Sequence, residues 1–260
     1  MNDRRRAIIG IDKESNQGST GLSYTLLSGG NAYACSGIGT CIETDISIGS
    51  VYQGKPVTQI SPQAFHNNKT ITGVFIPSSI QMLEFKSFSG CSNLSSIIMD
   101  EGSSLGSASY IFANCKLRGA VTKLPESVTQ IPGSCFETQQ GSGIAKYILG
   151  SHVTSIGAYS FRLTNIKIIF QSVTPPTFGT NWAASEYYHS QRFYVPYQSI
   201  DEYKSAPNAT DKASAMRPLV NTTADLLTID TSKYTVACVV GENKDFIEYQ
   251  YDGLNWNAIS

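Results

Sequence analysis

The three histidines of the chain are the side chains best suited to acid–base chemistry near neutral pH. His66, His152 and His189 lie far apart in the sequence. His66 is expected on an outer turn, His152 opens a V-x-x-I segment, and none of the three has a nucleophile at a motif spacing. The pattern therefore predicts surface or hydrogen-bonded histidines rather than a catalytic base.

Other groups of catalytic type lack the context that their chemistry needs. Asp100 and Glu101 are adjacent in an expected loop, which favours solvation over the separated carboxylate pair of a glycosidase. Gly141-Ser142-Gly143 has the rhythm of an anion-binding loop, but it precedes an expected strand rather than a helix. The chain has no G-x-S-x-G elbow, P-loop or dinucleotide fingerprint. We therefore expect no enzyme activity, no catalytic residues and no cofactor.

The six cysteines do not have the spacing of a metal site, because no C-x-x-C pair is followed by further Cys or His ligands. Cys91 and Cys115 each lie three residues after a recurring phenylalanine, which predicts buried thiols that act as small apolar side chains. A disulfide between Cys35 and Cys41 stays open as an alternative. We expect no bound metal.

The net charge of −1 over 260 residues gives no reason to expect a nucleic-acid partner, and Arg4-Arg5-Arg6 is too short a run to change this. No stretch approaches the ~18 apolar residues of a membrane span, so no membrane insertion is expected. Residues 1–16 have a basic start but too short an apolar stretch for a secretory signal. The sequence as written predicts either a protein kept in the cytoplasm or one whose signal has been removed.

The elements that must position these residues follow a repeat. A phenylalanine recurs at steps of 23, 24, 24 and 25 residues, at Phe65, Phe88, Phe112, Phe136 and Phe161. A fixed period in this range indicates a solenoid, in which each unit stacks on its neighbours because it cannot bury a core alone. We predict that these five side chains form the structural core. The third unit, before Phe112, is irregular, and a local bulge is expected there.

Each unit also carries a short strand, in which alternate side chains point to opposite faces. Val74 and Ile76 are expected to point inward, as are their equivalents in later units. The outward positions are occupied by Phe75, Ile98, Lys123, Ile148 and Ile169. This mostly apolar stripe predicts a binding surface for a partner, unless the N-terminal arm or the C-terminal unit folds over it.

The repeats resemble those of the BspA-type leucine-rich repeat family over residues 33–205. The matching text is V-x-x-I-x-x-x-A-F-x-x-(C/N)-x-x-I/L-x-x-V/I-x-I/M-P, clearest over residues 57–77 and 80–99. The resemblance implies a repeat solenoid with a leucine-rich-repeat-like parallel β ladder and short convex turns or helices. It also implies adhesin-like display on a bacterial surface.

The expected organisation has five parts: an N-terminal arm or cap (1–32), the solenoid (33–173), its C-terminal cap (174–206), a linker (207–224) and a small antiparallel β unit (225–260). Pro218 marks the linker, and Asp252-Gly253 is a hairpin signal. The ending Y-x-Y-D-G-x-x-W resembles C-terminal modules of phage fibre and tail proteins.

These observations favour a non-catalytic recognition or adhesion protein. Its partner would be a protein or glycan surface of a host or particle, and homo-oligomerisation stays open. The phage-like ending and the missing secretory signal favour a virion-associated fibre or decoration protein, located in the virion. The alternative is an adhesin at the bacterial cell surface. A third hypothesis is a carbohydrate-active enzyme that uses the cap residues Trp182, Tyr187 and Tyr188.

Overall fold

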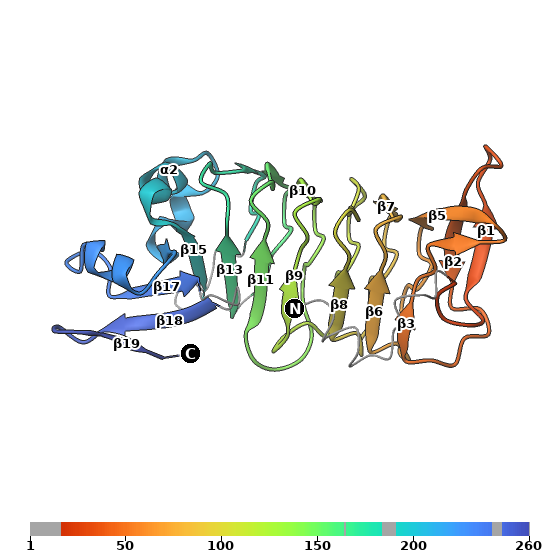
Figure 1. Ribbon diagram of the computed structural model, residues 1–260, viewed down its shortest axis with the longest axis horizontal. Coiled ribbons are helices and arrows are strands. Elements are labelled where there is room, and N and C mark those ends of the chain that lie inside the picture. The colour runs from red at the N-terminus through yellow and green to blue at the C-terminus, as the bar shows by residue number, and fades with distance from the viewer. Residues whose placement is uncertain (1–16, 164, 184–190, 241–245, 260) are drawn as a thin grey trace.

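In the computed structural model the chain forms an elongated solenoid whose rungs lie side by side along its long axis (Figure 1). The structure describes residues 17–163, 165–183, 191–240 and 246–259. The N-terminal strands lie at one end and the C-terminal strands at the other, so sequence order is largely spatial order (Figure 1). The predicted repeat solenoid with a parallel β ladder is confirmed.

The main wall of the solenoid is a mostly parallel sheet in two blocks. Each strand pairs with the strand of the next rung, as Val74 with Ile97 and Tyr147 with Ile168. The first block contains β3 (Asp45–Ser47), β6 (Gly73–Ile76) and β8 (Ser96–Met99). The second block contains, in spatial order, β9 (Val121–Lys123), β11 (Ala145–Leu149), β13 (Ile166–Phe170), β15 (Arg192–Pro196), β16 (Met216–Val220), β17 (Val236–Val240), β18 (Phe246–Tyr251) and β19 (Trp256–Ala258).

A second wall is built from shorter strands and is also interrupted once. At the N-terminal end, β1 (Ser23–Leu26) pairs antiparallel with β2 (Tyr33–Gly37) and closes this end of the wall. The ladder continues through β5 (Lys55–Ile60), which also pairs with β4 (Val51–Tyr52), to β7 (Met82–Leu83). A separate ladder joins β10 (Gln130–Ile131), β12 (Ser155–Ile156) and β14 (Thr177–Phe178).

The helical segments of the described chain are short and lie in its C-terminal third. They are η2 (Tyr197–Ser199), α2 (Ile200–Ser205), η3 (Thr210–Ala215) and η4 (Ala224–Thr228).

The recurring phenylalanines stack face to face through the interior, in chain order from Phe65 to Phe161. Neighbouring ring centroids are 4.8, 5.3, 5.6 and 5.5 Å apart, with interplanar angles between 6° and 16°. The backbone links the same rungs, since Phe65 N–H donates to the Ser87 carbonyl (2.8 Å) and Phe136 N–H to the Ser160 carbonyl (2.8 Å). The stack is thus the axis on which the rungs are assembled.

Both walls break at the third unit. In the main wall β8 and β9 do not pair, and in the second wall no described strand lies between β7 and β10. Leu105 is still fully buried there, although it lies seven residues before Phe112 whereas Leu83 lies five before Phe88. The predicted irregularity is thus present at the third unit. It is an interruption of both strand ladders, however, and not the local bulge that was expected.

The C-terminal third continues the main sheet. The antiparallel region predicted at the C-terminus is present, because β18 pairs antiparallel with β17 and β19. The range 207–224, expected as a linker, instead carries η3 and β16, and β16 pairs in parallel with β15. Pro218 is tolerated because pairing of β16 with β17 begins only at the next residue, Leu219.

Candidate recognition surface

The outward strand positions, expected to form an exposed apolar stripe, are mostly covered. Phe75, Ile148 and Ile169 are only 7%, 6% and 1% exposed. Ile98 is partly exposed and Lys123 is exposed. None of the five belongs to the main interior cluster, so the strand alternation does turn them outward. Of the two alternatives left open, an exposed stripe is therefore wrong for three of the five residues, and cover by the C-terminal unit is present at Ile148 and Ile169.

Part of this outward side is a second apolar cluster. It contains Ile148, Ile169, Tyr194, Leu219, Cys238 and Phe246, the last two from the C-terminal strands β17 and β18. Beside the cluster, buried Glu248 accepts a hydrogen bond from the Tyr194 hydroxyl and pairs with Lys167. Burial and the contact with Glu248 raise the pKa of Tyr194. This side of the C-terminal half is therefore internal structure rather than an open ligand surface.

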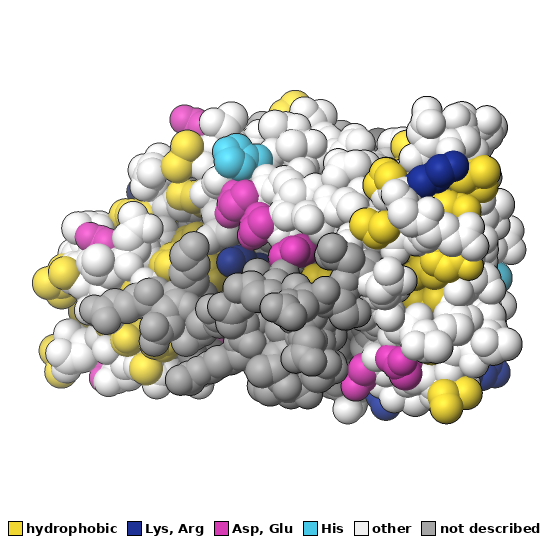
Figure 2. Space-filling view, turned by 45° about the vertical axis from the view of Figure 1, so that its right-hand side comes forward, with side chains coloured by type: hydrophobic (Ala, Val, Ile, Leu, Met, Phe, Trp, Pro, Cys, Tyr) yellow, Lys and Arg dark blue, Asp and Glu magenta, His cyan; other side chains and the backbone are white. Residues whose placement is uncertain are grey.

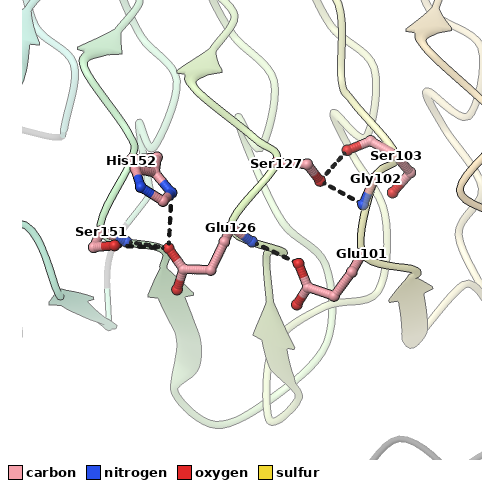
Figure 3. A network of polar contacts seen from close by, with 7 residues as sticks. All are labelled: Glu101, Gly102, Ser103, Glu126, Ser127, Ser151 and His152. Carbon is pink, nitrogen blue, oxygen red and sulfur yellow. Dashed lines mark hydrogen bonds and ion pairs between the residues drawn. The ribbon is translucent and has the colours of Figure 1, made fainter.

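Polar side chains join three successive rungs at the turns that follow the main-wall strands (Figure 3). Glu101 accepts the backbone N–H of Glu126 (3.0 Å), and Glu126 accepts both the N–H and the hydroxyl of Ser151 (2.8 Å each). Figure 2 shows acidic side chains next to a histidine on this surface. The carboxylates thus satisfy backbone N–H groups of the next rung, which is a structural role.

Ser151, Glu126 and His152 have the residue types of a hydrolase triad but not its geometry (Figure 3). Ser151 Oγ and His152 Nδ1 both approach the same atom, Glu126 Oε2, at 2.8 Å and 3.5 Å. In a triad the imidazole lies between the hydroxyl and the carboxylate, because it must take the hydroxyl proton. This cluster therefore does not activate Ser151.

The cysteines are all free thiols, so the alternative of a Cys35–Cys41 disulfide is not realised. Cys91 Sγ donates to the Phe65 carbonyl (3.0 Å) and Cys115 Sγ to the Phe88 carbonyl (3.2 Å), one rung back in each case. Burial raises the pKa of Cys115 well above its usual value. These thiols fill the inner turn as small apolar side chains.

Metal-ligand clusters and membrane-spanning helices are both absent from the described residues. Within residues 17–163, 165–183, 191–240 and 246–259, no three His, Cys, Asp or Glu side chains are grouped so that they could hold a metal ion. No helix in these ranges is long and apolar enough to cross a membrane.

Exposed aromatic and cationic side chains gather on the turns that carry the stacked phenylalanines. Phe85, Tyr110 and Tyr159 are 41%, 39% and 36% exposed. The Phe85 and Tyr110 rings lie edge to face with centroids 6.0 Å apart, and Lys86 Nζ lies 5.1 and 5.7 Å from the two centroids. The Arg162 guanidinium lies 5.2 Å from the Tyr159 ring centroid. We call Phe85, Lys86, Tyr110, Tyr159 and Arg162 the aromatic–cation row.

The backbone fixes the direction of this row. The residue two positions before each stacked phenylalanine has a left-handed conformation, with φ between 54° and 61°, at Gln63, Lys86, Tyr110, Ser134 and Tyr159. Such conformations are costly for residues other than glycine and persist only where surrounding contacts enforce them. Here rung-to-rung hydrogen bonds do so, since Lys86 N–H donates to the Ser109 carbonyl and Tyr110 N–H to the Gly133 carbonyl (3.2 Å each).

Comparison with protein families matches residues 56–182 to the BspA type leucine-rich repeat region, in six copies. Residues 56–182 form a BspA-type leucine-rich repeat region. The row and the phenylalanine stack both lie within this BspA-type region. Families of this kind are in general binding scaffolds rather than enzymes.

Two solved structures are similar to the chain at low identity. The leucine-rich repeat protein of T. pallidum is 15% identical, with a TM-score of 0.47, over 73% of this chain and 96% of that one. A leucine-rich cell surface protein from Faecalibacterium prausnitzii A2-165 is 16% identical, with a TM-score of 0.39, over 90% of this chain and 57% of that one. The chain thus spans little more than half the length of the second protein. A comparison with curated proteins found no match.

The remaining residues singled out in the sequence have structural surroundings where they are described. His66 Nδ1 is hydrogen-bonded to the Ser89 carbonyl (2.7 Å). Trp182 is fully buried, packs against Phe178 and Phe193, and donates its indole N–H to the Asn208 carbonyl (3.0 Å). It is therefore a core residue of the cap and offers no open ring to a sugar. Arg4, Arg5, Arg6, Tyr187, Tyr188 and His189 lie outside the described residues.

Sequence reasoning missed the aromatic–cation row because it searched the strands for a surface. The signal was present in the repeat itself. Phe85, Lys86, Tyr110 and Tyr159 lie two or three residues before Phe88, Phe112 and Phe161. The aromatic residues at these positions lie in turns and are partly exposed to solvent.

Proposed function

We propose that the chain is a non-catalytic recognition protein of the adhesin type, which acts at a bacterial cell surface and binds a protein or glycan through the aromatic–cation row. The single observation behind this proposal is the row itself: three aromatic residues, each more than one-third exposed, lie two or three positions before a stacked phenylalanine of the repeat. The BspA-type region supports the adhesin class, because this family is typically found on bacterial surfaces.

The chemistry of the row suits recognition. Tyr and Arg are enriched among residues that dominate binding energy, since they bring large, stiff contact area with hydrogen-bonding ends. Lys86 over the Phe85 and Tyr110 rings adds a cation that can meet a carboxylate or a carbonyl. The turn backbone holds these side chains in place before binding, which lowers the entropic cost of association.

The cell-surface location is preferred to the virion. The phage hypothesis was based on the C-terminal ending and on the missing secretory signal, and no comparison supports it. The C-terminal strands also extend the main sheet of the solenoid, as the parallel pairing of β15, β16 and β17 indicates, so they do not resemble a separate fibre module.

The proposal is tested on arrays of bacterial and host glycans and on a panel of host surface proteins. The wild type is compared with the double variant Phe85→Ala/Tyr110→Ala. We expect the variant to bind the identified ligand at least about tenfold more weakly, as for loss of a hot-spot pair. The matched control is Val121→Ala/Ile144→Ala, which removes two exposed apolar side chains from the main-wall region and should leave affinity unchanged. Equal binding by all three proteins would refute the role of the row.

The location is tested separately by antibody labelling of intact and lysed cells of the source bacterium. Labelling of intact cells supports a surface role. Labelling only after lysis would contradict it, whatever ligand the arrays identify.

A further inference from the structure

Strand β19, at the end of the main sheet in the described chain, is an edge whose one protection against pairing is its length of three residues. Soluble proteins guard exposed edges with short strands, lysine, proline, a bulge or a covering segment. The stretch from Leu254 to Ile259 is LNWNAI, which contains no charged residue and no proline. In the described chain β19 pairs only with β18. Its other edge therefore presents backbone donors and acceptors to solvent.

The hydrogen-bond pattern shows which groups face that edge. The Asn255 carbonyl accepts from Asp252 N–H (3.1 Å), and Ile259 N–H donates to the Glu248 carbonyl (2.8 Å). Antiparallel strands alternate the residues that bond to a given neighbour, so the odd-numbered positions face β18. The N–H and C=O groups of Trp256 and Ala258 therefore point outward.

A groove lined by both apolar and uncharged polar side chains lies next to this edge. Its volume is about 580 Å³, and it lies between η4 with the residues that follow it and the β18–β19 hairpin. Leu227 and Leu254, on its two sides, are each 86% exposed. Tyr251 and Trp256, whose ring centroids are 5.4 Å apart, add aromatic surface, and none of the lining side chains is charged. Apolar side chains exposed to this degree beside a free edge indicate a surface that is normally covered.

We propose that the occupant is a second copy of this chain, joined edge to edge through β19 about a twofold axis. Antiparallel pairing about an axis through Asn257 sets Trp256 opposite Ala258 of the other copy. The outward groups of both strands then bond to each other, which is the self-complementary arrangement of a closed twofold interface.

Charge supports a like partner. A twofold axis brings only the central side chain next to its own copy, so a charged residue at the centre would repel itself. Here the central residue is Asn257, and its neighbours on β19 are uncharged. The axis is perpendicular to the joined sheet, so the grooves of the two copies lie on the same face of that sheet. We expect Leu227 and Leu254 to become buried near the second copy.

The test is sedimentation equilibrium of the purified full chain over a range of concentrations. We expect a reversible monomer–dimer equilibrium, in which the average mass rises with concentration to twice the monomer mass and no further. Ala258→Pro removes an outward N–H but none of the bonds to β18, so it should abolish the dimer. Leu254→Asp and Leu227→Asp should each weaken it by about tenfold or more. Ile42→Asp, at an isoleucine 95% exposed in the N-terminal part of the chain, is the matched control and should leave dimerisation unchanged.

Three results would overturn the proposal: a wild type that stays monomeric at all concentrations, a dimer that survives both Ala258→Pro and Leu254→Asp, and assembly beyond two chains. Circular dichroism of each variant checks that it folds. Leu254→Asp changes only a solvent-exposed side chain at the hairpin turn, so it keeps the test decisive should Ala258→Pro disturb the hairpin.

Discussion

Phe136 is the fourth of the five stacked phenylalanines and contacts rings on both sides of it. Phe112 and Phe161 lie 5.6 and 5.5 Å away and Tyr147 lies 4.8 Å away, centroid to centroid. Replacing Phe136 by alanine leaves a cavity that backbone bonds to the neighbouring rungs prevent from collapsing. We predict a loss of about 3–5 kcal/mol in the free energy of unfolding, measured by urea denaturation.

Phe65→Ala should give a loss of the same order, because Phe65 stacks on Phe88 with an interplanar angle of only 6°. Gln140→Ala, at an exposed position, is the control and should change stability little. Unchanged unfolding midpoints in both phenylalanine variants would show that the stack does not support the solenoid.

Thiol reactivity is a second property set by single residues. Five cysteines are buried and only Cys41 is partly exposed. Burial raises the pKa of Cys35 and of Cys238 to about 12, and the thiolate is the reactive form. We predict that Ellman's reagent titrates one thiol per native chain, at Cys41, and all six after denaturation. Fast native reaction of Cys91 or Cys115 would contradict their place in the inner turn.

At the scale of elements, one buried contact ties the C-terminal hairpin to the repeats. Glu248 of β18 meets Lys167 of β13 and Tyr194 of β15 on the outward side of the sheet. Glu248→Ala leaves the Lys167 charge buried without this carboxylate. We predict a loss of about 3–5 kcal/mol in unfolding free energy, measured by chemical denaturation. The double variant Glu248→Ala/Lys167→Met should recover much of it. A stable Glu248→Ala protein would mean that the hairpin is held by other contacts.

The turns explain why we assign recognition to the aromatic–cation row rather than to the strands. Strand residues are turned outward by simple alternation, but whether they stay exposed depends on what lies over the sheet. Turn residues such as Tyr110 are held outward by their own left-handed backbone and by bonds to the next rung. The solenoid thus displays side chains through its turns.

For the whole molecule, the interruption at the third unit divides the ladders into two cooperative blocks. Stability in a solenoid is the sum of each unit and its contacts with its neighbours, so a missing ladder lowers protection locally. We predict that amide hydrogen exchange inside the solenoid is fastest over residues 100–120, measured by mass spectrometry on the native protein. Uniform protection from 57 to 170 would contradict this division.

The repeat made the fold predictable from sequence, because a buried phenylalanine at a fixed period leaves few alternatives to stacked rungs. The irregular third unit could be located for the same reason. The structure of residues 207–224 could not be predicted in this way. Pro218 locally favours the end of a strand, and it is accommodated within β16 only by the register of β16 with its neighbours. The burial of Ile148 and Ile169 could not be predicted from the local sequence pattern either, because they pack against Cys238 and Phe246, which are distant in the chain.

The most direct test of recognition through the turns is hydrogen-exchange mapping of the protein with its identified ligand. Ligand binding should slow exchange in the turns around Phe85, Tyr110 and Tyr159 and leave the outward strands β6, β8 and β11 unchanged. Slowed exchange confined to those strands, with the turns unaffected, would contradict recognition through the aromatic–cation row.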